Sequence, residues 1–105
     1  MRPTAPPPDP PAAASMYLGD MYRDGRGGLT KNEQEVARLY KLAADKGVAD
    51  AQFRLGVFYE GSLGFAVYRI GRGGLPKDEL EAARLYKLAG DQGLVAAQYN
   101  LGVLY

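Results

Sequence analysis

Apolar residues recur along this chain at the three- and four-residue spacing that places side chains on one face of an α-helix. The pattern occurs in short blocks at 14–22 and 51–59, and in longer blocks whose stripes begin at 36 and 82. The four apolar stripes are Ala14, Tyr17, Leu18, Met21 and Tyr22; Ala51, Leu55, Phe58 and Tyr59; Val36, Leu39, Tyr40 and Ala43; and Ala82, Leu85, Tyr86 and Ala89. The pattern predicts an all-α chain in which a short helix alternates with a longer one.

Each longer helix carries its own start and stop signals. Asn32 and Asp78 precede the two helices, and a glutamate follows each of them three positions later, as in a capping box. Gly47 and Gly93 follow the last apolar positions, where helices commonly end on a residue with left-handed backbone. These signals predict where both longer helices begin and end.

The blocks are copies of one unit. Segment 26–47 aligns without gaps to segment 72–93 with 16 identities in 22 positions, and the short block occurs a third time at 97–105. Self-similarity with a period of roughly 20 to 50 residues is typical of solenoid proteins. A glycine holds the same register in all three short blocks, at Gly19, Gly56 and Gly102. Because glycine weakens a helix, its recurrence predicts a close helix contact that a side chain would block.

The repeat divides the chain into a tail and about two and a half units. We expect a disordered, proline-rich tail at 1–12 and a first unit at 13–49. A second unit is expected at 50–95, with a nine-residue insertion near 61–70, and the first helix of a third unit at 96–105. The chain is therefore expected to form five helices.

The spaced pattern A-x-x-x-L-G-x-x-Y, a glycine turn, then D/N-x-x-x-A-x-x-x-Y-x-x-A-x-x-x-G resembles the Sel-one-like repeat (SLR), a relative of the tetratricopeptide repeat. The matching residues are Ala51, Leu55, Gly56, Tyr59, Gly71, Gly73, Leu75, Asp78, Ala82, Tyr86, Ala89 and Gly93. The resemblance covers about 13–105 and implies a right-handed α/α solenoid of about two and a half repeats. It also implies a concave surface that faces other proteins, core positions for Tyr40 and Tyr86, and no catalytic residues.

Composition narrows the possible functions. The chain has 13 basic and 12 acidic residues, a net charge of +1, and neither cysteine nor histidine. The lack of both residue types excludes disulfides, thiolate or imidazole metal sites and Ser-His or Cys-His catalytic pairs. No basic stripe predicts nucleic-acid binding, no apolar run is long enough to cross a membrane, and the first 15 residues lack the apolar stretch expected of a signal peptide. We therefore expect no cofactor, a protein or peptide partner, and a cytoplasmic location only by default.

At positions that differ between the copies, the repeat fold does not require a particular residue type. Because the first helix of each unit lines the concave side in the family that the chain resembles, some of these positions should face a partner. We expect a partner-binding surface at Tyr17, Asp20, Arg54, Val57 and Asn100. A second, apolar patch is expected in the insertion, at Phe65, Val67 and Ile70.

Three functional hypotheses remain open at this stage. The first is a protein-interaction scaffold that binds a peptide or partner domain on the concave face. The second is a structural piece of a longer array that associates end to end, because Leu101, Leu104 and Tyr105 should be partly bare. The third and most remote is a hydrolase that uses Glu33 with Glu35, or Glu79 with Glu81. Since residues two apart on a helix do not face each other, the carboxylate spacing disfavours this third hypothesis.

The insertion has three possible conformations. The first helix of the second unit could end near Gly61, run on toward Arg69, or give way to a hairpin at Phe65–Ile70; we favour the first. The glycine-rich loops at 25–28 and 71–74 precede helices, where a phosphate could bind. Since neither loop follows a strand or contains a GK[ST] sequence, we interpret both loops as turns.

Overall fold

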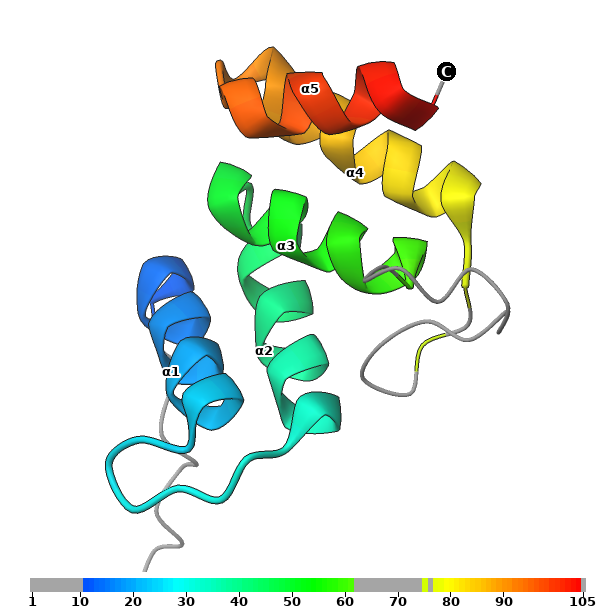
Figure 1. Cartoon of the computed structure of the whole chain (residues 1–105). Helices are drawn as coiled ribbons and strands as arrows, with labels where there is room; N and C mark the ends of the chain where they lie inside the picture. Colours follow the sequence, from blue (N-terminus) through cyan, green and yellow to red (C-terminus); the bar gives the residue numbers. More distant parts are fainter. Residues whose placement is uncertain (1–10, 62–74, 76, 105) are drawn as a thin grey trace, which may run out of the picture.

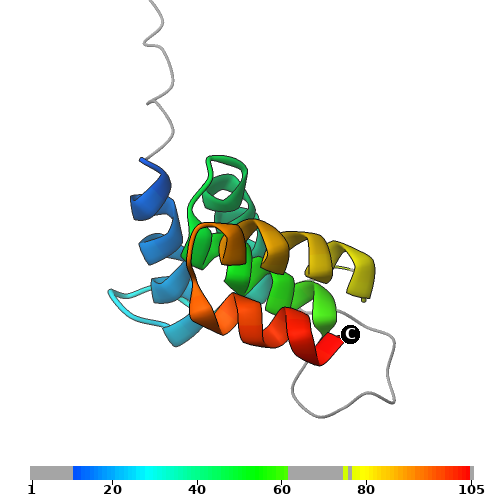
Figure 2. The same cartoon turned by 90° about the horizontal axis from the view of Figure 1, so that it is seen from above.

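The computed structural model describes residues 11–61, 75 and 77–104, and these residues form five helices. The helices are α1 (Ala12–Asp24), α2 (Glu33–Asp45), α3 (Ala49–Glu60), α4 (Glu79–Asp91) and α5 (Val95–Leu104). Consecutive helices pack against each other, so the chain forms a stack of helical hairpins (Figure 1). Seen from above, α1, α3 and α5 lie on one side and α2 and α4 on the other (Figure 2). We call the first set the A layer and the second the B layer; together they are the expected α/α solenoid.

The B-layer helices begin at the predicted caps. The side chain of Asn32 accepts a hydrogen bond from the backbone N–H of Glu35 at 3.2 Å, and that of Asp78 accepts one from Glu81 at 3.0 Å. Both helices are followed by a glycine with positive φ, Gly47 at 91° in the first copy. The start and stop signals of the sequence are therefore confirmed.

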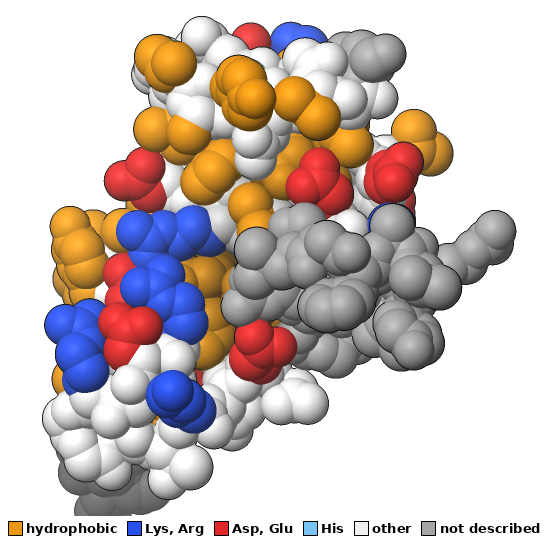
Figure 3. Space-filling model, in the orientation of Figure 1, with side chains coloured by type: hydrophobic (Ala, Val, Ile, Leu, Met, Phe, Trp, Pro, Cys, Tyr) orange, Lys and Arg blue, Asp and Glu red, His pale blue; other side chains and the backbone are white. Residues whose placement is uncertain are grey.

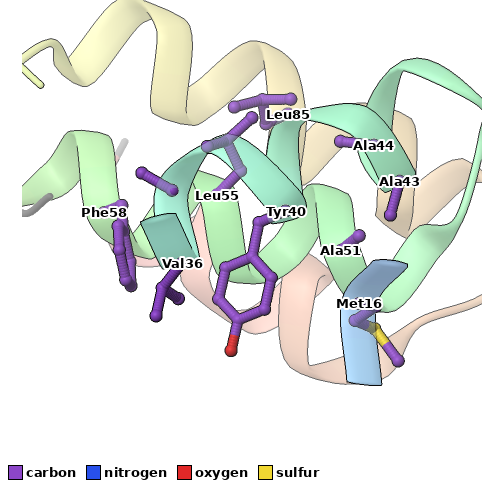
Figure 4. Close-up of a cluster of buried hydrophobic side chains, with 10 residues drawn as sticks. Met16, Val36, Tyr40, Ala43, Ala44, Ala51, Leu55, Phe58 and Leu85 are labelled. Carbon is purple, nitrogen blue, oxygen red and sulfur yellow. The ribbon is translucent and has the colours of Figure 1, made fainter. Parts of the chain in front are cut away.

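The core runs along the interface between the layers. Figure 4 shows Tyr40 at the centre of one cluster, with residues from several helices around it. All eight residues of the two predicted B-layer stripes are buried: Val36, Leu39, Tyr40, Ala43, Ala82, Leu85, Tyr86 and Ala89. A second cluster joins α3, α4 and α5, so burial continues from one repeat to the next.

The recurring glycines hold the two layers close together. A Cβ atom on Gly19 would lie 2.8 Å from Cε1 of Tyr40, and one on Gly56 would lie 2.7 Å from Cε1 of Tyr86. These distances are shorter than a van der Waals contact, so the predicted close approach is confirmed at both positions. At Gly102, the added atom would have no neighbour within 4 Å among the described residues.

The predicted apolar face of the first helix is wrong at its first two positions, whereas Leu18, Met21 and Tyr22 are partly buried as expected. Ala14 is exposed and Tyr17 is 61% exposed, whereas Ser15 and Met16 are buried. In α3, the equivalent of Ala14 is Ala51, which is covered by the α2 side of the core. Among the described residues no helix precedes α1, so the equivalent side of α1 faces outward.

The helix before the insertion ends where we favoured. Helix α3 ends at Glu60, and Gly61 follows with a φ of 68° and donates its N–H to the carbonyl of Phe58. The alternative in which this helix runs on toward Arg69 is therefore wrong. Residues 62–74 lie outside the described part of the chain, and they include the predicted patch at Phe65, Val67 and Ile70.

Candidate functional site

A group of polar side chains joins α1, α2 and α3 on the A-layer side. Oδ1 of Asp20 accepts a hydrogen bond from the Tyr40 hydroxyl at 2.6 Å and a short one from Nη1 of Arg54. Arg23 approaches the same carboxylate oxygen at 3.4 Å. Asp20 is only 7% exposed, and a buried carboxylate is costly unless it is paired. Here the pairing cations come from two different helices, Arg23 from α1 and Arg54 from α3.

Burial and hydrogen bonding shift the proton affinity of this group. Burial raises the pKa of Tyr40 above its ordinary value, and the hydrogen bond to Asp20 raises it further. Burial lowers the pKa of Arg54, but its hydrogen bonds to Asp20 and Tyr40 outweigh this effect and hold that pKa above the usual value. The Arg54 guanidinium also lies 5.7 Å from the centre of the Tyr40 ring, within the range of a cation–π contact. Arg54 is thus charged at physiological pH and fixed in orientation.

A hollow of about 240 Å³ lies beside this group. Its lining residues are Arg23, Tyr40, Phe53, Arg54, Val57 and Phe58. Figure 3 shows Lys and Arg side chains gathered over α1 and α3, next to hydrophobic side chains. The hollow therefore combines apolar walls with two guanidinium groups, in a surface to which α1, α2 and α3 all contribute. We call it the α1–α3 hollow.

The five residues predicted to bind a partner do not form one continuous surface in the structure. Arg54 and Val57 line the hollow, and Asp20 lies beneath it as the hydrogen-bond partner of Arg54. Tyr17 projects from α1 with 61% of its surface exposed, and Asn100 lies on α5, on the side of the core where Tyr86 is buried. The structure thus brings three of the five together and places the other two apart from them.

Sequence reasoning missed four lining residues of the hollow, for two reasons. Tyr40 and Phe58 belong to the predicted apolar stripes, and Phe53 does not stand out because its counterparts Met16 and Tyr99 are also apolar. Arg23 follows the last residue of the short block, where the third copy supplies no residue for comparison. The contrast between Arg23 and its counterpart Glu60 was the signal that could have found it.

The carboxylates considered for hydrolysis have structural roles. Glu35 pairs with Arg38, and Glu81 pairs with Arg84, each one helical turn apart on the B layer. The hydrogen bond from Arg38 lowers the pKa of Glu35, which is the opposite of what a general acid requires. These side chains stabilise helix starts and do not converge on a cleft.

The first glycine-rich loop forms a turn, as we interpreted it. Gly25, Gly27 and Gly28 have positive φ values, and the N–H of Leu29 donates to the carbonyl of Arg26 at 3.1 Å. The second loop at 71–74 lies outside the described residues. In the described segments, no group of His, Cys, Asp or Glu is placed to hold a metal ion, and no helix has the length and apolarity to cross a membrane.

Comparison with known families decides the classification. The Sel1 repeat profile matches residues 12–48, 49–94 and 95–105, which is nearly the whole chain. The chain belongs to the Sel1 repeat family. Sel1 repeats are generally helical modules for protein–protein interaction, and their fold is generally a scaffold without catalytic function.

Two solved structures show the same fold. A Sel1 repeat protein from Oxalobacter formigenes is 32% identical, with a TM-score of 0.73 over 89% of this chain and 34% of that protein. A protective antigen of uropathogenic Escherichia coli strains, which displays an SLR fold, is 30% identical, with a TM-score of 0.71 over 87% of this chain and 17% of that protein. This Sel1 chain therefore spans about a third and a sixth of their lengths. No curated protein matches it.

Proposed function

We propose that this Sel1 chain is a protein-interaction module that binds a peptide or partner domain on the A-layer face, with the α1–α3 hollow as its anchor. The observation that carries the proposal is the hollow itself, which combines apolar walls from Phe53, Val57 and Phe58 with the guanidinium groups of Arg23 and Arg54. Aromatic and arginine side chains in a concave site dominate the binding energy of many protein interfaces.

The side chains that line the hollow contact one another without a partner. Arg54 is held by Asp20 and Tyr40, and the Tyr40 and Phe58 rings meet edge to face with centroids 5.6 Å apart. A site whose side chains are already ordered loses less conformational entropy on binding. This order supports recognition of a defined partner segment by the face.

The proposal is tested by substitutions on opposite faces of the solenoid. Val57→Glu introduces a charge into the hollow, and Leu80→Glu introduces the same charge on α4, at a B-layer position that is 86% exposed. Captured partners from a display library of random twelve-residue peptides should be lost with the first variant and kept with the second. Equal retention by both variants, with circular dichroism showing both folded, contradicts binding at the hollow.

A second candidate, self-association through the last helix, is favoured by a separate observation. Val95, Tyr99 and Val103 form an exposed stripe on α5, and Tyr99 is 72% exposed. The equivalent residues of α3 are Ala49, Phe53 and Val57, which pack against the second core cluster. Leu101 and Leu104, which we expected to be partly bare, are half-buried, and Tyr105 lies outside the described residues.

Sedimentation velocity tests this second candidate. If the stripe mediates association, the wild-type chain should sediment as a dimer or larger species, and Tyr99→Ser should shift it to the monomer. The matched control is Leu80→Ser, which removes an exposed apolar residue from another face. A wild-type chain that stays monomeric at several hundred micromolar contradicts self-association.

A further inference from the structure

Arg54 has donors that the fold does not use. An arginine carries five N–H donors in a planar fork. Within the described residues, the hydrogen bonds of Arg54 to Asp20 and Tyr40 are both made by Nη1. The edge formed by Nε and Nη2 donates to none of the described residues, and the side chain is 29% exposed. This edge matches the two oxygens of a carboxylate in a bidentate pair.

The charges around Arg54 favour an anion at that edge. Asp20 is shared between Arg23 and Arg54, so two guanidiniums surround one buried carboxylate. Arg23 also pairs with Asp24 at 3.1 Å, but both partners are about two-fifths exposed. Because exposed pairs contribute little, a ligand carboxylate could displace Asp24 from Arg23 at small cost. The local positive charge is therefore available to a ligand.

We propose that the Nε–Nη2 edge of Arg54 binds the side-chain carboxylate of a glutamate or aspartate in the partner peptide. An apolar residue next to that acidic residue occupies the α1–α3 hollow against Phe53, Val57 and Phe58. A side-chain carboxylate is preferred to a chain terminus because the A layer continues past the hollow with α5 beyond α3, so a bound peptide has further surface to follow (Figure 1). This inference rests on the proposed function and adds the chemistry of the ligand.

We call the place where α1 and α3 meet over Tyr40 of α2 the first junction of the A layer, and the equivalent place where α3 and α5 meet over Tyr86 of α4 the second. The second junction does not offer the same chemistry. The counterparts of Asp20, Arg23 and Arg54 are Val57, Glu60 and Asn100. Among the described residues there, the Tyr86 hydroxyl meets the carboxylate of Glu60 at 3.3 Å, and no guanidinium takes the place of Arg54. The acidic residue of the ligand is therefore assigned to the first junction only.

Peptide selection on the full chain tests the assignment. From a display library of random twelve-residue peptides, we expect enrichment of Glu or Asp next to an aliphatic or aromatic residue. In the best synthetic peptide, Glu→Gln should weaken binding roughly 10- to 100-fold, as for hydrogen bonds to charged groups. Amidation of the peptide's C-terminus should change affinity less than threefold.

A spectroscopic readout locates the contact. The peptide should shift the Nε–Hε cross-peak of Arg54 in a ¹H–¹⁵N spectrum, and its glutamine version should not. Because Arg54→Gln alone leaves the buried Asp20 without its principal cation, the affinity test uses Asp20→Asn/Arg54→Gln against Asp20→Asn. Arg84→Gln removes a guanidinium on α4 that is paired with Glu81, and it serves as the control for net charge.

The outcomes separate this inference from the proposed function. Peptides that shift A-layer resonances without any acidic preference overturn the inference and leave the interaction module standing. Loss of binding on C-terminal amidation, with no effect of Glu→Gln, overturns the assignment to a side chain. Peptides that bind with no effect on any A-layer resonance overturn both proposals.

Discussion

The two junctions of the A layer share one packing contact and differ in the charges that surround it. At the first junction, Tyr40 rests on Gly19, and its hydroxyl meets a buried carboxylate that binds Arg54. At the second, Tyr86 rests on Gly56, and its hydroxyl meets the carboxylate of Glu60. The tyrosine–glycine contact fixes how the helices stack, whereas the groups at the hydroxyl are free to change.

This difference explains how one scaffold can carry different surface chemistry in each repeat. The first junction buries Asp20 and compensates it with a cation from the next repeat, so the charge pair also joins α1 to α3. The second junction has Asn100 at the Arg54 position, a neutral side chain that cannot compensate a buried carboxylate. We therefore expect the first junction to be more sensitive to polar substitutions and both to be equally sensitive to loss of the glycine.

The largest expected effect is on the shared contact. Gly56→Val places side-chain atoms too close to the Tyr86 ring, whose Cε1 would lie 2.7 Å from the new Cβ. This overpacking should lower the free energy of unfolding by about 3 kcal/mol. Gly102→Val stands at the same register, where no described atom lies within 4 Å, and should change stability by less than about 0.5 kcal/mol. Urea denaturation followed by circular dichroism measures both. Equal losses would show that the contact with the Tyr86 ring is not the source of the cost.

The next effect distinguishes the two junctions by charge. Arg54→Gln leaves the buried Asp20 carboxylate without its principal cation and should cost about 2 kcal/mol, because the pair is partly exposed. Asn100→Ala at the equivalent position should cost under about 1 kcal/mol. Adding Asp20→Asn to Arg54→Gln should restore much of the loss. If it restores nothing, the carboxylate is not the source of the cost.

The tyrosine hydroxyls give a smaller contrast in the same assay. Tyr40→Phe removes a 2.6 Å hydrogen bond to a buried carboxylate and should cost about 1.5 kcal/mol. Tyr86→Phe removes a 3.3 Å bond to a half-buried glutamate and should cost about 0.5 kcal/mol. A larger loss for Tyr86→Phe than for Tyr40→Phe would contradict the expectation that the first junction is the more sensitive to polar substitutions.

The smallest effect is a loss of stability in alkali that both junctions share. Burial raises the pKa of Tyr40 and of Tyr86, so the folded state holds these protons more tightly than the unfolded chain does. This stability is complete well below pH 10, the ordinary tyrosine pKa, and is lost as the pH rises above it. Each tyrosine should contribute at most about 0.4 kcal/mol of loss by pH 10. Urea midpoints at pH 8 and pH 10 should therefore differ less for Tyr40→Phe than for the wild type.

Much of the fold could be predicted from the amino-acid sequence alone because the repeat unit occurs in two similar copies. The stripe around Tyr40 recurs around Tyr86, and the caps at Asn32 and Asp78 recur with it, so local signals and repeat register agree. The face of the first helix could not be predicted in this way. Helical periodicity places Ala14 on an apolar face, but only a neighbouring helix can bury it.

The candidate site was harder to predict because it depends on contacts between repeats. Variation between copies pointed to Arg54, Val57 and Asp20, which the structure brings together. It gave no hint that Asp20 is buried, because a carboxylate on a short helix is ordinarily solvated. Nor could it show that Tyr40, which recurs as Tyr86, sends its hydroxyl to the edge of a hollow.

The central claim is that Arg54 in the α1–α3 hollow binds an acidic side chain of a partner. A double-mutant cycle tests it most directly, with Asp20→Asn as the common background so that the buried carboxylate is removed throughout. Calorimetry would give the affinities of Arg54 and Arg54→Gln chains for the selected peptide and for its Glu→Gln version. The account predicts a coupling energy of about 1 to 3 kcal/mol between the arginine and the glutamate. Additive effects, with no coupling between them, would contradict it.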